Sequence, residues 1–291
     1  MLERLVDPHV VPISKPKFMI SGDAGVGKTM FALDFPKPIL FDAEGGATRP
    51  EYQEKLKNVG GKYFGKEHGS QSFENLIELV KSLTTEKHEF KTLIVDSFSY
   101  LYMLAAAEAE IKGGSEYGRD KKMANIPTRK LMLNVEKLDL TVIFVTHSKD
   151  KWETRGKDRI VVDTTFDGWD KMEFMLDLWI ELFRDRKNFL VKKSRVAAFP
   201  QDQAFPLTYE RFSGLYGKEI MEKESVPVVL ANHAQLIQLR QLIETLSISV
   251  EQQDKVLTSF NAEKWEELSE PQIQKAIGGL QKKINSLKGE K

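Results

Sequence analysis

A glycine-rich loop near the start of the chain joins an apolar segment to a helical one, in the sequence FMISGDAGVGKTMFALDF at residues 18–35. Gly22, Gly27, Lys28 and Thr29 fit the pattern G-x-x-x-x-G-K-[ST]. In such a loop the glycines let backbone N–H groups point at phosphate oxygens, the lysine reaches the β- and γ-phosphates, and the hydroxyl binds Mg²⁺. We therefore expect ATP and Mg²⁺ to bind at Gly22, Asp23, Ala24, Gly25, Val26, Gly27, Lys28, Thr29 and Met30.

Short apolar segments alternate with helical patterns over residues 1–225, which is typical of an α/β domain with a mainly parallel central sheet. The expected strands are 17–21, 38–44, 91–97, 141–147, 177–185 and 187–194. The expected helices lie near 27–34, 72–84, 98–111 and 121–138. The last two strands meet at Asp185 and Arg186, which predicts an antiparallel hairpin that closes one edge of the sheet.

The sequence changes character after the segment 208–229, which we interpret as irregular. Three capping boxes follow, each a polar residue with Gln three positions later: Asn232 with Gln235, Ser249 with Gln252, and Ser269 with Gln272. They predict three short amphipathic helices, the first with the apolar face Leu236, Leu239, Leu242, Ile243 and Leu246. We expect two domains, an α/β core at 1–225 and a small all-α domain at 226–291.

The overall composition excludes several kinds of site. Lys plus Arg and Asp plus Glu both number 43, so any patch that attracts nucleic acid has to be local. The absence of cysteine excludes disulfides, thiolate zinc sites and cysteine nucleophiles. The amino terminus lacks the pattern of a signal peptide and no apolar stretch is long enough to span a membrane, so we expect a cytoplasmic protein.

Two carboxylates follow expected strands beside the glycine-rich loop. Asp96 ends the apolar run TLIV, at the carboxyl end of its strand, where it could hold Mg²⁺ together with Thr29. Glu44 follows the strand in PILFDAE, where a carboxylate could orient and deprotonate the attacking water. These positions predict a site that hydrolyses ATP.

Around Glu44 the chain resembles the RecA/RadA recombinase superfamily, in the residues Asp42, Ala43, Glu44, Gly45 and Gly46 with Arg49 and Pro50 after them. The resemblance covers roughly residues 15–225 and implies a RecA-like P-loop core. It implies that His147, at the end of its strand, senses the γ-phosphate. It also implies that Lys193 and Arg195 act as fingers on the nucleotide of the next subunit. Residues two apart on a strand share a face, so we expect both cations to point the same way.

More narrowly, the chain resembles the phage Sak-type annealing proteins, which have a RecA-like core and no large amino-terminal recombinase domain. About 16 residues precede the first expected strand, too few for such a domain. This difference from the full recombinases favours annealing of single strands over strand invasion.

Two basic segments flank the strand at 141–147, namely 112–130 and 149–159. In the RecA-like arrangement these would be loops that line the axis of a ring or filament, and their glycines suggest disorder without a ligand. Cations that follow phosphates and an aromatic ring that stacks on bases are what single-strand binding needs. The candidate DNA-binding residues are Arg119, Lys121, Lys122, Lys149, Lys151, Trp152, Arg155 and Lys157.

The sequence thus predicts an oligomeric P-loop ATPase, slow and stimulated by DNA, that binds single-stranded DNA in recombination or annealing for a bacterial virus. Two alternatives stay open: a DNA-translocating motor related to helicases, and a nucleotide-gated scaffold that docks a replication or recombination partner. For the helical domain we expect a partner such as a single-strand-binding protein, with regulation of the loops or packing against the core as alternatives.

Overall fold

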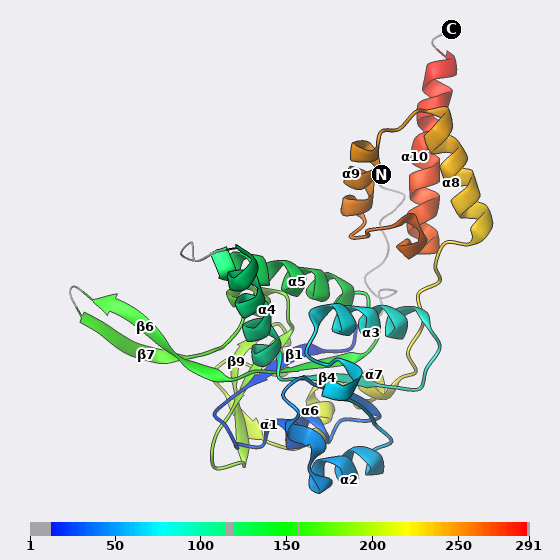
Figure 1. Cartoon of the computed structure of the whole chain (residues 1–291). Helices are drawn as coiled ribbons and strands as arrows, with labels where there is room; N and C mark the ends of the chain where they lie inside the picture. Colours follow the sequence, from blue (N-terminus) through cyan, green and yellow to red (C-terminus); the bar gives the residue numbers. More distant parts are fainter. Residues whose placement is uncertain (1–12, 114–118, 156–157, 290–291) are drawn as a thin grey trace. The chain divides into compact units, whose positions relative to one another are not determined.

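The computed structural model describes residues 13–113, 119–155 and 158–289 (Figure 1). The chain divides into two compact units, one formed by residues 1–83 and 87–226 and the other by 84–86 and 227–291. Within the described residues, no helix is long and apolar enough to cross a membrane.

Eight strands form one sheet in the described part of the first unit, in the order β10-β9-β8-β1-β5-β4-β2-β3. Their bounds are β1 Lys17–Ser21, β2 Pro38–Asp42, β3 Lys62–Phe64, β4 Thr92–Asp96, β5 Thr141–Val145, β8 Leu178–Leu182, β9 Asn188–Ser194 and β10 Ala204–Pro206. The pairs from β8 through β1 to β3 are parallel, and those of β8 with β9 and β9 with β10 are antiparallel. The prediction of an α/β core with a mainly parallel sheet is therefore confirmed.

Helices cover both faces of this sheet: α1 Lys28–Ala32, α2 Pro50–Asn58, α3 Phe73–Thr85, α4 Phe98–Gly113, α5 Arg119–Val135, α6 Tyr209–Tyr216 and α7 Lys218–Glu222. Successive strand residues point to opposite faces. Met19 accordingly joins a core cluster with α3, α4 and α5, whereas Phe18 and Ile20 join another with α1, α2, α6 and α7. Because both faces are buried, each central strand contains a continuous apolar run, and these runs made the strands recognisable in the sequence.

Beyond β5 the chain forms an antiparallel two-stranded ribbon, β6 Ser148–Arg155 and β7 Asp158–Phe166, which extends away from the sheet (Figure 1). The prediction of a loop at 149–159 is wrong for the described residues 149–155 and 158–159, which form strands. β-Branched residues dominate the second strand, in the sequence RIVVDTTF, and they favour extended backbone. Because the ribbon faces solvent on both sides, it also carries many charged residues. These charges made the strand pattern hard to recognise in the sequence.

Other sequence predictions also need correction. β9 does not close the sheet edge, because β10 pairs with it from outside, and β3 was not expected. The segment 208–229 is not wholly irregular, since α6 and α7 lie in it and the Thr208 side chain caps α6 by accepting from the backbone N–H of Arg211. α5 confirms the helix expected near 121–138, and it also takes up the part of the expected loop 112–130 from Arg119 onward.

The second unit contains α8 His233–Thr245, α9 Val250–Ser259 and α10 Glu270–Gly289. The capping boxes at Asn232 and Ser249 are confirmed, and the backbone N–H of Ser269 donates to Gln272 Oε1 at 2.9 Å. α10 is longer than predicted. The small core of this unit holds the buried side chains Leu239, Leu257, Leu268, Ile273 and Ile277.

Candidate nucleotide site

The glycine-rich loop runs from the end of β1 to the start of α1 and depends on glycine at three positions. Gly22, Gly25 and Gly27 have φ angles of 149°, 76° and 99°, which favour glycine. A Cβ atom at Gly22 would also lie 2.7 Å from the carbonyl oxygen of Leu182 on β8. The loop is therefore shaped as the sequence pattern requires, with its backbone held close to the neighbouring strand.

Lys28 is folded over this loop. Its Nζ donates to the carbonyl oxygens of Gly22 at 2.7 Å and Asp23 at 2.8 Å, and the residue is only 8% exposed. Burial lowers the pKa of Lys28, an effect that nearby Asp96 and Glu44 only partly offset. The loop thus holds a poorly solvated cation, whose charge a polyphosphate could neutralise.

Thr29 and Asp96 come together as the sequence suggested, since Thr29 Oγ1 donates to Asp96 Oδ2 at 2.6 Å. Burial raises the pKa of Asp96 to about 6. Stabilisation from protonated Asp96 is therefore full below about pH 4, its ordinary pKa, and is lost as the pH rises through about 6. Nearby Lys28 lowers the pKa of Asp96 and so offsets only part of the effect of burial on this carboxylate. A hydroxyl and a carboxylate are the hard oxygen donors that Mg²⁺ takes from proteins alongside substrate phosphates, so these residues fit the ion.

Glu44 and His147 form a second polar group at the carboxyl ends of the strands. His147 Nε2 lies 2.9 Å from Glu44 Oε1, and the Ser97 hydroxyl donates to the same oxygen. The hydrogen bond from His147 lowers the pKa of Glu44, and reciprocally raises that of His147. Glu44 is thus held ionised, with an exposed side that can accept a hydrogen bond from water. Ser97 was not anticipated, although it directly follows Asp96.

Asp42 positions the loop that carries Glu44. Its buried carboxylate accepts from the backbone N–H groups of Gly45 at 2.8 Å and Ala47 at 2.9 Å, and from the Tyr63 hydroxyl at 3.1 Å. In the sequence, Asp42 was recognised only as part of the motif around Glu44, without a role of its own. Asp followed closely by Gly-Gly is a sequence signal for a turn that the Asp side chain caps. No sequence signal indicated that Tyr63 on β3 would contact Asp42.

Two arginines from the turn between β8 and β9 contact the glycine-rich loop and were not predicted. Arg186 Nη2 donates to the carbonyl oxygen of Gly25 at 2.6 Å, and Arg184 Nε lies 3.3 Å from Asp23 Oδ2. The turn reaches the loop because β8 pairs directly with β1. In the sequence the two arginines are noticeable only because they lie close together. Their spacing does not indicate that they contact the glycine-rich loop.

Lys193 and Arg195 lie apart from this group of contacts. Both donate to backbone carbonyls of one short segment, Lys193 to Leu176 and Arg195 to Phe174. Burial lowers the pKa of Lys193. Among the described residues their contacts do not include Lys28 or Glu44, so their expected action on a nucleotide stays a prediction.

The predicted DNA-binding residues other than Lys157 fall on two elements, α5 and β6. Lys149, Lys151 and Trp152 lie on β6, where Lys149 pairs with Asp167 at 3.2 Å and Trp152 is 47% exposed. Lys122 is exposed on α5. Lys157 and the side chains of Arg119, Lys121 and Arg155 lie outside the described parts of the structure.

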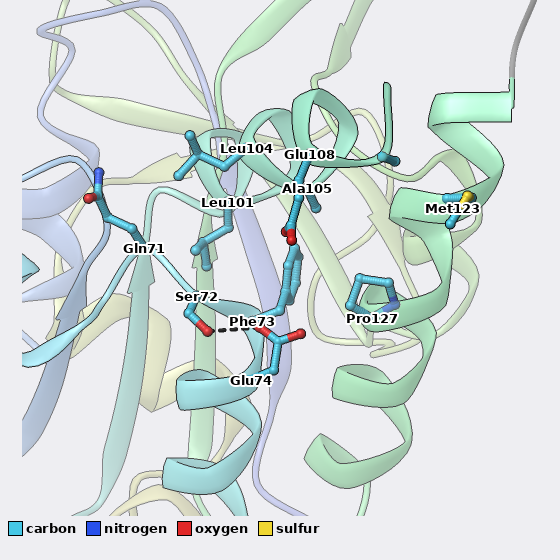
Figure 2. A pocket seen from close by; sticks show the side chains of 11 residues that line it. Gln71, Ser72, Phe73, Glu74, Leu101, Leu104, Ala105, Glu108, Met123 and Pro127 are labelled. Atoms are coloured by element: carbon cyan, nitrogen blue, oxygen red, sulfur yellow. Dashed lines mark hydrogen bonds between the residues drawn. The ribbon is translucent and has the colours of Figure 1, made fainter. Parts of the chain in front are cut away.

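A cavity of about 420 Å³ lies away from the glycine-rich loop, between the start of α3 and helices α4 and α5 (Figure 2). Phe73, Leu101 and Pro127 line it together with the carboxylates of Glu74 and Glu108. Two carboxylates at its wall disfavour a polyanion, so we do not assign this cavity to nucleotide or DNA.

Comparison with protein families agrees with this geometry. A family model described as an AAA domain matches residues 14–206. Solved structures also match, among them one described as an ATPase domain, with 16% identity over 62% of this chain and 78% of that chain and a TM-score of 0.36. No curated protein matches the sequence.

Proposed function

This chain belongs to the AAA domain family, and we propose from that premise that it is an ATP- and Mg²⁺-dependent ATPase that binds single-stranded DNA as a homo-oligomer. We propose annealing or recombination as its role, as in the Sak-type proteins that it resembles. The observation that carries the ATPase proposal is the convergence of the Thr29–Asp96 and Glu44–His147 pairs at the carboxyl edge of the sheet.

Each residue of the site has a distinct task in this proposal. Backbone N–H groups of the loop and Lys28 bind the phosphates, and Thr29 and Asp96 hold the metal ion. Bound Mg²⁺ would supply charge neutralisation at the phosphate oxygens. Glu44 accepts a hydrogen bond from the attacking water and then its proton. His147 reports the state of Glu44 to the ribbon, which begins at the next residue.

The Glu44 contacts also bear on the alternatives. A nucleotide-gated scaffold needs binding but no water activation, and it gives no reason for an ionised carboxylate held by both Ser97 and His147. These contacts support hydrolysis.

The ribbon suits single-stranded DNA because β6 carries an exposed indole, Trp152, and the two exposed lysines Lys149 and Lys151. Trp152 and Val161 are direct cross-strand partners and are 47% and 48% exposed. Base stacking on an aromatic side chain tolerates any sequence, and lysines add contacts to phosphates. A ribbon that projects from the sheet can reach a strand held on the axis of an oligomer.

We expect Trp152→Ala to weaken binding of a labelled single-stranded oligonucleotide by about 1–3 kcal/mol, the contribution of one stacked base. Fluorescence anisotropy at fixed salt measures the affinity. Val161→Ala is the matched control, because it removes the cross-strand partner and keeps the indole. Equal losses in the two variants would mean that ribbon stability, and not stacking, is responsible.

We propose that Arg195 acts on the nucleotide of a neighbouring subunit. Arg195→Ala should then retain ATP binding and lose hydrolysis by about 10³-fold or more, the usual contribution of an arginine finger. Mixing this variant with Lys28→Ala should restore part of the activity, because the Lys28 variant still offers Arg195 to its neighbour. Steady-state ATPase assays of the mixture decide the point. No recovery at any mixing ratio would refute action between subunits.

A further inference from the structure

The helical unit contains an apolar groove of about 300 Å³ between α9 and α10. The large apolar residues that line it are Ile243, Ile248, Val256, Phe260, Trp265 and Leu280. Their side chains are half-buried, and the small core of this unit lies behind them. An apolar surface of this kind, open in a domain with so little core, is a recognised mark of an interaction site.

Gly279 lines the groove from the middle of α10. A Cβ atom there would meet nothing within 4 Å, and the same holds for its neighbour Gly278. Glycine inside a helix is less stable than alanine, so the packing of this unit gives no reason for glycine at either position. At Gly279 the missing side chain leaves the groove floor open to close approach by another chain.

The groove carries positive charge on the side formed by α10. Lys275 is the only charged residue among those that line it, and its Nζ lies 5.7 Å from the ring centroid of Phe260. Lys275, Gly279 and Lys282 are spaced i, i+4 and i+7, so they share a face of α10. In the described part of the chain neither lysine has an ion-pair partner among the acidic side chains. A carboxylate laid along this side of the groove would find two cations.

The residues around Trp265 set a limit on the charge of a ligand. Glu263, Glu266 and Glu267 flank the indole in the sequence. Glu266 pairs with Arg240 at 2.6 Å, and the acidic residues beside it in the sequence disfavour a polyanion such as a nucleic-acid strand next to Trp265. A peptide with one apolar anchor and a carboxylate beside it avoids this repulsion, because its charge stays on the α10 side.

We propose that this groove docks a peptide segment of a partner protein, with a large apolar side chain over Gly279, between Phe260 and Trp265, and an adjacent carboxylate at Lys275. The apolar anchor supplies burial, and the lysine fixes the orientation of the peptide. This site is separate from the nucleotide site and does not depend on the proposed ATPase activity.

Selection of displayed random peptides against the full chain tests the proposal. The selected peptides should carry a large apolar residue next to Asp or Glu. Gly279→Leu, which fills the groove, should weaken their binding by at least about tenfold. Gly278→Leu changes the adjacent glycine, which does not line the groove, and should leave the affinity nearly unchanged. Thermal unfolding of both variants checks that α10 stays folded.

A charge series completes the test. Lys275→Glu should weaken the selected peptides, and Lys275→Arg should bind them as the parent does. Basic or uncharged selected peptides, or equal effects of the two glycine variants, would overturn the proposal.

Discussion

Lys28→Ala should weaken ATP binding by about 100-fold or more, as expected from loss of charge-assisted hydrogen bonds to phosphate in a poorly solvated loop. The parent holds this cation at 8% exposure, and burial lowers its pKa, so the folded chain gains little from the charge itself. Removal of the amine should therefore weaken ATP binding and leave the free energy of unfolding almost unchanged. Calorimetric titration with ATP and Mg²⁺ measures the affinity, and thermal unfolding measures the stability.

Lys37→Ala is the control for this variant. Lys37 is an exposed lysine that pairs with Glu89 at 2.6 Å, outside the glycine-rich loop. It should bind ATP as the parent does. Parent-like affinity in the Lys28 variant would contradict the assignment of the loop.

Glu44→Gln should reduce ATP hydrolysis by about 10²- to 10⁴-fold, the usual contribution of a general base, with ATP affinity nearly unchanged. Glutamine is almost the same size and can still accept from the Ser97 hydroxyl, but it cannot take a proton from water. Single-turnover measurements with bound ATP separate hydrolysis from binding.

NMR titration gives a second readout in the same variant. The pKa of His147 is raised mainly by its hydrogen bond to Glu44, so it should fall toward the ordinary value when the carboxylate is lost. Glu51→Gln, on the exposed first turn of α2, is the control and should change neither quantity. Normal turnover in Glu44→Gln together with a lowered His147 pKa would exclude Glu44 as the base.

The parts of the site that could be predicted from the sequence are those set by local pattern. The spacing from Gly22 to Thr29 and the position of Asp96 after four apolar residues each depend on one strand and the turn that follows it. Parallel strands bring such turns to the same edge of the sheet, so the meeting of Thr29 and Asp96 followed from the fold class.

The parts that were missed depend on which strands are neighbours. Arg186 reaches Gly25 only because β8 lies next to β1, and Tyr63 reaches Asp42 only because β3 adds to β2. Local sequence patterns also gave wrong predictions where charged residues and strand- or helix-forming residues occurred in the same segment. The segment 112–130 was interpreted as a loop although a helix was expected from residue 121, and the charges of β6 concealed the strand pattern of the ribbon.

The ATPase rate with single-stranded DNA, with duplex DNA and without DNA, all at one fixed salt concentration, tests the central claim most directly because it examines the site and the ligand together. We predict hydrolysis that single strands stimulate and duplex does not. A rate that no DNA changes, in a protein that still binds ATP, would contradict the account and favour a nucleotide-gated scaffold.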